Sequence, residues 1–252
     1  MPVNIENLSM RGPADITPLT CLDYPGKAAC IFWFRGCNLR CPYCYNPEFV
    51  TTGGAEERLD WMRFLDERRG FLDAVVMSGG EATLHRDLLP VCRAVKQMGY
   101  LVKIDTNGSS PLVLEALIAE GLVDYVAVDH KMPAVRTFHL QNGVSLFDRF
   151  CETVGVLRTA RVPFEVRTTC HPSLLDEQDI VNMIHEAAEL GYTGTYFLQY
   201  YFDAGETLGH MKKPVRRYDR LWIDSRSALP LGYRNFPEDR YSFKANPIAV
   251  SA

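Results

Sequence analysis

AACIFWFRGCNLRCPYCYN, residues Ala28 to Asn46, is the stretch that decides how the rest of this chain is interpreted. Its first part, up to Phe34, is apolar and rich in aromatic residues, which predicts a buried β-strand. Three cysteines follow at once with C-x3-C-x2-C spacing: Cys37, Cys41 and Cys44. Three thiolates on one short loop can hold three irons of a cubane iron–sulfur cluster and leave the fourth iron without a protein ligand. A substrate or cofactor can then bind the open iron directly.

Other interpretations of the three cysteines remain open at this point. They could be structural thiols, or part of a zinc site with a fourth ligand such as His85 or His130. Neither histidine lies at the spacing of a zinc finger. A disulfide framework fits poorly, because a chain of 252 residues does not depend on covalent staples.

The composition predicts a globular protein of one large or two small domains. Of the 252 residues, 47% are hydrophobic, which is enough for a full core. The formal net charge of −4 argues against nucleic acid or an anionic membrane as a partner. We find no 18-residue apolar stretch and no signal peptide in residues 1–15, so we expect a cytoplasmic protein. The densest basic cluster, Lys212-Lys213 with Arg216-Arg217, is interpreted as the solvated start of a helix.

Apolar runs and amphipathic segments alternate along the chain. The runs predict strands at Ala28–Phe34, Asp73–Met77, Leu101–Ile104, Tyr125–Val128, Phe164–Thr168 and Thr195–Leu198. The amphipathic segments predict helices at Arg58–Arg69, Arg86–Met98, Pro111–Glu120, Leu146–Thr159 and Glu177–Leu190, four of them followed by glycine. Six strand–helix units imply a parallel sheet with right-handed crossovers. We therefore predict an α/β fold, a partial, open (β/α)6 TIM-like barrel over residues 1–236, followed by a tail at 237–252.

Polar residues follow each predicted strand. Ser78-Gly79-Gly80-Glu81, Asp105-Thr106-Asn107-Gly108, Asp129-His130-Lys131, Arg167-Thr168-Thr169 and Gln199-Tyr200-Tyr201 all lie at such positions. Taken singly, each is an ordinary turn or helix cap. Parallel strands, however, end at the same rim of a barrel, which is where such folds carry their chemistry. The sequence therefore predicts one site, next to the cysteine loop.

The cysteine loop followed by Gly79-Gly80-Glu81 resembles the radical S-adenosylmethionine (SAM) enzymes, over roughly Thr17 to Arg234. The chain is most similar to the activating proteins of glycyl-radical enzymes, in particular those of the anaerobic ribonucleoside-triphosphate reductase type, which are related to pyruvate formate-lyase activating enzyme. Four segments carry this narrower resemblance: residues 21–27 (CLDYPGK), 105–108 (DTNG), 121–129 (GLVDYVAVD) and 234–236 (RNF).

The resemblance implies roles for particular residues. Cys37, Cys41 and Cys44 would hold a 4Fe–4S cluster, whose open iron would chelate the amino and carboxylate groups of SAM. Gly79, Gly80 and Glu81 would meet the methionine amino group, and Tyr43 would pack near the adenine. The remaining matches are Asp105, Thr106, Asn107, Asp129 and Lys131, near the methionine carboxylate and the ribose, with Arg167 and Tyr201 as weaker ones. In some related activases the acidic pair also helps to hold a monovalent cation. Pyruvate formate-lyase activases have histidine near the position of Tyr201, so this chain departs from them there.

The implied reaction is reductive cleavage of SAM to a 5′-deoxyadenosyl radical, with no side chain as catalyst. For an activase, the hydrogen is taken from a backbone glycine of a partner enzyme, and flavodoxin or ferredoxin would donate the electron. Two alternatives stay open. One is a radical enzyme acting on a small molecule or peptide, like the 7-carboxy-7-deazaguanine synthases. The other is a binding module that a metal merely stabilises.

Overall fold

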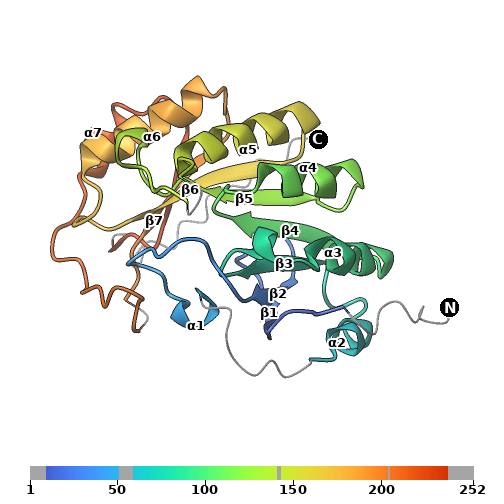
Figure 1. The fold of residues 1–252 in the computed structure, drawn as a ribbon. Coiled ribbons are helices and arrows are strands. Elements are labelled where there is room, and N and C mark those ends of the chain that lie inside the picture. Colours follow the sequence, from blue (N-terminus) through green and yellow to red (C-terminus); the bar gives the residue numbers. More distant parts are fainter. Residues whose placement is uncertain (1–9, 51–58, 141–142, 204, 238–252) are drawn as a thin grey trace.

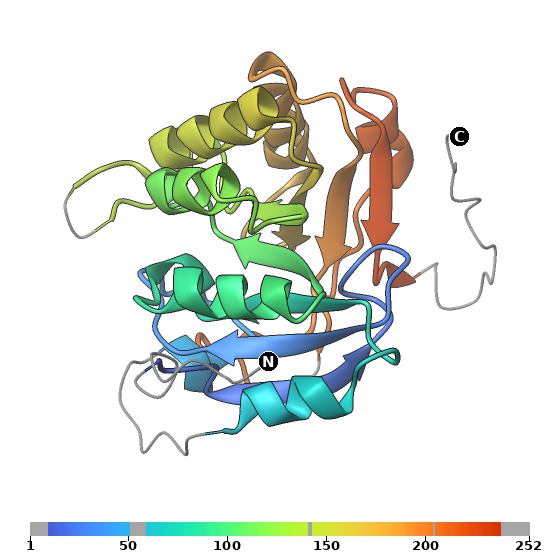
Figure 2. The same ribbon diagram turned by 90° about the vertical axis from the view of Figure 1, so that its right-hand side faces the viewer.

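The computed structural model describes residues 10–50, 59–140, 143–203 and 205–237. Within them one eight-stranded sheet runs in chain order from β1 to β8. Its strands are β1 (Asp15–Thr20), β2 (Ala29–Phe34), β3 (Ala74–Gly79), β4 (Leu101–Thr106), β5 (Tyr125–Asp129), β6 (Phe164–Cys170), β7 (Tyr196–Tyr200) and β8 (Leu231–Arg234). Figures 1 and 2 show a strongly twisted sheet with helices along one face.

The six predicted strands form the parallel centre of this sheet, from β2 to β7. The two edge strands were not predicted. β1 pairs antiparallel with β2, and β8 pairs parallel with β7. The edges do not pair with each other, so the sheet stays open, as the (β/α)6 prediction requires.

The helices follow the predicted segments closely. α2 (Trp61–Glu67), α3 (Leu88–Gln97), α4 (Pro111–Ala119), α5 (Leu146–Ala160) and α6 (Glu177–Glu189) connect successive strands. The described residues also form short elements: α1 (Pro47–Val50), η2 (Ala82–Leu84), η3 (Ala134–Arg136) and α7 (Arg220–Asp224). No helix among the described residues is both long and apolar enough to cross a membrane.

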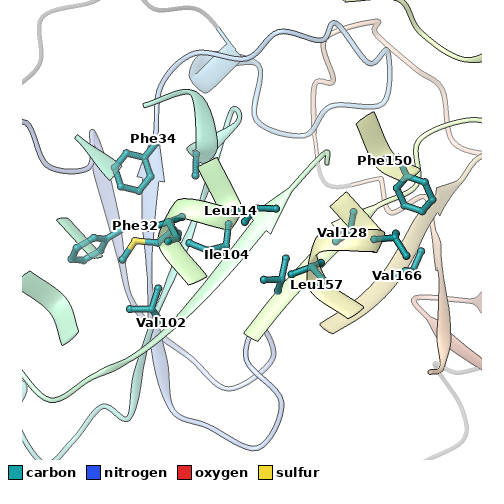
Figure 3. Packing of buried hydrophobic residues seen from close by; sticks show 14 of the residues in the cluster. Phe32, Phe34, Val102, Ile104, Leu114, Val128, Phe150, Leu157 and Val166 are labelled. Carbon is teal, nitrogen blue, oxygen red and sulfur yellow. The ribbon is translucent and has the colours of Figure 1, made fainter. Parts of the chain in front are cut away.

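The main core lies between the outer face of the sheet and the helices. Alternate strand residues, such as Phe32, Ile104 and Val128, point toward this layer and are fully buried. Figure 3 shows Leu114 of α4 and Leu157 of α5 packed against them. Because the strands are buried against these helices, their sequences are nearly continuous apolar runs.

The inner face of the sheet is different in its two halves. At β2 and β3 it carries a small apolar cluster that includes Ala29, Ile31 and Val76. Leu101 of β4 and Tyr125 of β5 still pack against this cluster. Farther along these strands and on the later ones, the inner face carries polar and charged residues: Lys103 and Asp105 on β4, Asp129 on β5, Glu165 and Arg167 on β6, Gln199 on β7 and Arg234 on β8. The apolar runs in the sequence located these strands but did not predict that their inner face is charged.

Two predictions concern the last part of the chain. The basic cluster at residues 212–217 was interpreted as a helix start, and this was wrong, because α7 begins only at Arg220 with Asp219 as its N-cap. The predicted tail, 237–252, lies outside the described residues except for Pro237.

Candidate active site

A single cavity of about 270 Å³ collects most of the predicted site residues. All three motif cysteines line it. So do Tyr43, Gly79, Gly80, Glu81, Asp105, Thr106, Asn107, Asp129, Lys131 and Arg167. Tyr201 is the predicted residue that does not line this cavity. It is 2% exposed and packs behind the cysteine loop, in a cluster with Leu39, Cys41 and Tyr43.

Gly80, directly after β3, lets the cysteine loop lie against the end of the sheet. Gly80 N–H donates to the carbonyl of Phe34 at 2.9 Å, and Glu81 N–H donates to the carbonyl of Gly36 at 2.8 Å. A Cβ on Gly80 would lie 2.3 Å from the Gly36 carbonyl oxygen and 2.5 Å from that of Phe49. Only glycine therefore allows the strand end to approach the first residues of the cysteine loop this closely.

The Glu81 carboxylate is already occupied by the protein. Its Oε1 accepts from the backbone N–H and the hydroxyl of Thr83, and from the hydroxyl of Thr106 at 2.7 Å. Its Oε2 accepts from the N–H of Asn107 at 2.7 Å. Burial raises the pKa of this carboxyl, and the four hydrogen bonds oppose that effect. Glu81 thus ties the loop after β3 to the loop after β4, and it faces the cavity chiefly through its backbone.

A buried network of charges forms the opposite wall. Arg167 donates to Asp129 at 2.6 Å and contacts Asp105 at 3.2 Å. Lys131 pairs with Asp129 at 2.9 Å, and Lys103 pairs with Asp105. Burial alone would raise the pKa of both carboxyl groups, but the neighbouring cations outweigh burial and hold both pKa values below the usual range. Both acids are therefore ionised at neutral pH.

The same contacts concern the monovalent cation that, in some related activases, is held with the help of the acidic pair matched here by Asp105 and Asp129. Asp105 and Asp129 are bridged by the guanidinium of Arg167 and also paired with Lys103 and Lys131. Side chains of this chain thus already neutralise both carboxylates.

The cysteine loop fits a cluster with an open iron. Burial raises the pKa of Cys37 to about 11, so the apo thiol is protonated and iron must displace the proton, as metal ions do on binding thiols. Among the described residues, no three His, Cys, Asp or Glu side chains converge as one metal ion requires. Thiolates that bind three different irons of a cubane need not converge on one point.

The zinc alternative depended on His85 or His130, and neither lines the cavity. The ring of His85 packs against Phe34, at 4.9 Å between centroids. His130 is 2% exposed, and its ring stacks on Phe150 in the outer core. Both rings thus pack against residues of the outer core and not in the cavity.

The hydroxyl of Tyr43 also indicates that the cavity can bind a ligand. It is buried and has no hydrogen-bond partner among the described residues. Lys131 Nζ lies 5.9 Å from the centre of the ring. An unpartnered buried hydroxyl is costly, and a bound polar molecule would satisfy it.

Several site residues were not predicted. Asn38, inside the cysteine motif, donates to Ser109 Oγ and accepts from Asn107 Nδ2, both at 2.9 Å. Asp23 and Asn235 line the cavity from segments next to the two open edges of the sheet. Asn38 could have been predicted as a site residue, because it is a polar residue between two of the motif cysteines. The positions of Asp23 and Asn235 depend on tertiary structure that local patterns do not encode.

The chain belongs to the radical SAM superfamily, whose profile matches residues 31–187. SAM and a 4Fe–4S cluster are therefore its cofactors, and the residues around the cavity fit both.

Several sequence relatives are activating enzymes by name. A protein of Methanocaldococcus jannaschii, assigned by its name to the glycyl-radical enzyme activating enzymes, is 37% identical over 174 residues, covering 66% of this chain and 70% of that protein. The pyruvate formate-lyase 1-activating enzyme of Escherichia coli K12 is 31% identical, over 66% of this chain and 70% of its own. Relatives of this chain thus carry the names of activating enzymes, of glycyl-radical enzymes in one case and of pyruvate formate-lyase in the other.

A solved structure supports the fold. SuiB of Streptococcus suis, in a crystal structure bound to S-adenosylmethionine, superposes with a TM-score of 0.60 at 16% identity. The match covers 81% of this chain, which spans about half the length of SuiB.

Proposed function

We propose that this chain installs a glycyl radical on a partner enzyme after cleaving SAM reductively. The observation that carries the proposal is the extent of the matches to activating enzymes, which include about two thirds of this chain and 70% of each relative. The anaerobic ribonucleotide reductase type is the partner class that the sequence motifs favour.

The residues around the cavity would divide the work as follows. Cys37, Cys41 and Cys44 would hold the cluster, which with bound SAM supplies a one-electron cleavage that yields the 5′-deoxyadenosyl radical. Gly79 and Gly80 would present backbone groups to the methionine end, because the lack of a Cβ lets this turn lie directly against Phe34 and Gly36, next to the cysteine loop. The ionised pair Asp129 and Lys131 would orient the polar groups of SAM, and the buried charges hold this pair in place.

The opening of the cavity suits a protein substrate. Asp23 precedes β2 and Asn235 follows β8, so residues from both ends of the sheet line the same cavity. A glycine-bearing backbone segment could therefore enter along the open side. Glycine is chemically suited to this reaction, because its radical is stabilised by the adjacent amide groups and no side chain blocks approach.

The test uses anaerobically purified protein with a reconstituted cluster. Dithionite and SAM should yield 5′-deoxyadenosine and methionine, and the Cys37→Ala variant should yield neither. Adding a glycyl-radical enzyme should produce a glycyl radical, detected by electron paramagnetic resonance. Failure to assemble an iron–sulfur cluster would overturn the proposal.

A second candidate has one observation in its favour. The 7-carboxy-7-deazaguanine synthase of Aquifex aeolicus is 35% identical, but over 89 residues, or 35% of this chain. Catalytic turnover of a purine-like small molecule, with no radical transfer to protein, would favour this candidate over the activase.

A further inference from the structure

The basic cluster found in the sequence lies beside the cysteine loop. Residues 207–218 contain four Lys or Arg residues and no Asp or Glu, in a chain of net charge −4. We call residues 207–213 the strap, because this irregular segment after β7 covers the outside of the cysteine loop. Two backbone hydrogen bonds join it to that loop: Leu208 N–H donates to the carbonyl of Cys44 at 3.1 Å, and Gly209 N–H donates to that of Pro42 at 2.8 Å.

The strap is held firmly from both sides. Met211 packs against the cluster of Leu39, Cys41 and Tyr43, and its carbonyl accepts from the Tyr201 hydroxyl at 3.1 Å. The Lys212 carbonyl lies 3.0 Å from Nε2 of the buried His171. The Nδ1 of His171 accepts from the N–H of Ser173, so Nε2 carries the proton and donates to Lys212. The backbone of the strap therefore has fixed positions for its exposed cations.

The outer side of the strap is positively charged. Lys212 and Lys213 are exposed, and neither has an ion pair among the described residues. Arg40, on the cysteine loop itself, is also exposed. Arg216 is neutralised by Glu177 at 2.6 Å, and the nearest acids of the strap's own segment, Asp203 and Glu206, precede it. Within the strap itself, the positive charge is therefore that of Lys212 and Lys213.

We propose that the strap is the docking surface for a small acidic one-electron carrier protein. This inference rests on the proposed radical chemistry, which consumes one electron per SAM cleaved. On transfer the carrier is oxidised by one electron and the cluster is reduced by one, with no bond made or broken. The strap joins exposed cations to the cysteine loop through two hydrogen bonds, and bonded paths favour electron tunnelling over gaps. Complementary charge would steer the carrier to this face.

The test compares two pairs of charge reversals. The variant Lys212→Glu/Lys213→Glu changes the strap. The control Lys27→Glu/Arg68→Glu changes the net charge equally, but Lys27 lines a different cavity at the opposite ends of β2–β4 and Arg68 follows α2. A flavodoxin serves as the acidic probe, and its dissociation constant is measured by calorimetry at low and at 1 M salt.

We expect the strap variant to weaken flavodoxin binding about tenfold or more at low salt, and the control to change it less than about twofold. Salt at 1 M should remove the difference. The rate of SAM cleavage should fall with flavodoxin as reductant and stay unchanged with dithionite. A Lys212→Gln/Lys213→Gln variant should show an intermediate effect, which separates charge from misfolding.

Equal binding by the strap variant and the unaltered protein would overturn the docking proposal. So would an equal loss in the control variant, since that would show an effect of net charge alone. The proposed radical chemistry fails on a different observation, namely no SAM cleavage by the unaltered protein with dithionite.

Discussion

At the scale of single residues, Glu81 shows how a motif residue can act through structure. Its carboxylate accepts four hydrogen bonds from Thr83, Thr106 and Asn107, and 2% of the residue is exposed. Glu81→Ala leaves these buried donors without a partner, so we expect it to lower the free energy of unfolding by about 3 kcal/mol. Glu81→Gln should cost less, because one amide oxygen still accepts. Urea unfolding of the cluster-free protein measures both, and equal stability of all three proteins would contradict this role.

Gly80 is a residue whose missing side chain matters. Its Cβ in Gly80→Ala would lie 2.3 Å from the Gly36 carbonyl oxygen, which belongs to the backbone and cannot move alone. We expect the variant to displace the cysteine loop, and so to bind less iron after reconstitution and to unfold at a lower temperature.

The matched control for Gly80 is Gly155→Ala, in the interior of α5, where a Cβ meets nothing within 4 Å. It should retain full iron content and gain stability of up to about 1 kcal/mol, as Gly→Ala does in helices. Equal iron content in both variants would show that the loop tolerates the change at Gly80.

At the scale of elements, the sequence predicts helix ends that are marked by glycine, but not a helix end that lacks one. Glycines at 70, 99, 121 and 191 were predicted to follow helices, and all four have positive φ. α5 ends differently, with Arg161 at φ 57° and ψ 30°. A side chain in this left-handed conformation is unfavourable, and no local sequence signal marks it.

This strain predicts a stabilising substitution. Arg161→Gly should raise the free energy of unfolding by about 1 kcal/mol, because glycine adopts positive φ without the steric penalty. Arg161→Ala removes the same side chain but keeps a Cβ, so it should leave stability nearly unchanged. Thermal unfolding of the two variants distinguishes backbone strain from an effect of the arginine side chain. An equal gain in both variants would mean that loss of the arginine side chain, and not relief of backbone strain, stabilises the protein.

Strands were predictable where one face packs on helices. Outward residues such as Phe32 and Ile104 gave the apolar runs that located β2 to β7. The edge strands escaped prediction because they are less buried and short of apolar residues: β1 contains Pro18, and β8 has four residues with Gly232 among them. An edge strand is defined by its neighbour more than by its own sequence.

At the scale of the whole molecule, the sequence predicted which residues meet at the ends of the strands, but it did not predict the ion pairs among them. The ends of parallel strands must meet, so the sequence placed the cysteine loop beside Asp105 and Asp129. It did not show that Lys103 and Arg167 would pair with them, since ion pairing across strands depends on register and on which face each residue occupies. The pairing of Asp129 with Arg167 in the β5–β6 ladder supplies that register.

The charged network should make stability depend on pH in a particular direction. Asp105 and Asp129 have pKa values below the usual range in the folded protein because of Arg167 and the two lysines. A carboxyl group whose pKa is lowered by folding contributes stability above its unfolded pKa of about 3.8, and this contribution is lost as the pH falls toward the folded pKa. The folded protein should therefore lose stability below about pH 4.

Arg167→Met tests this, because methionine keeps much of the volume and removes the charge that bridges both acids. At pH 7 we expect a loss of about 3 to 5 kcal/mol in the free energy of unfolding, the usual cost of breaking a buried ion pair from one side. The variant raises the pKa of both carboxyl groups, so the difference from the unaltered protein should shrink as the pH falls below about 4. Arg63→Met is the control, since Arg63 and Glu67 pair on an exposed helix surface, where such pairs contribute less than about 1 kcal/mol. Urea unfolding of the cluster-free proteins between pH 3 and pH 7 measures these differences. A pH-independent loss in Arg167→Met would mean that packing, and not the charge on two buried carboxylates, explains why Arg167 stabilises the inner face.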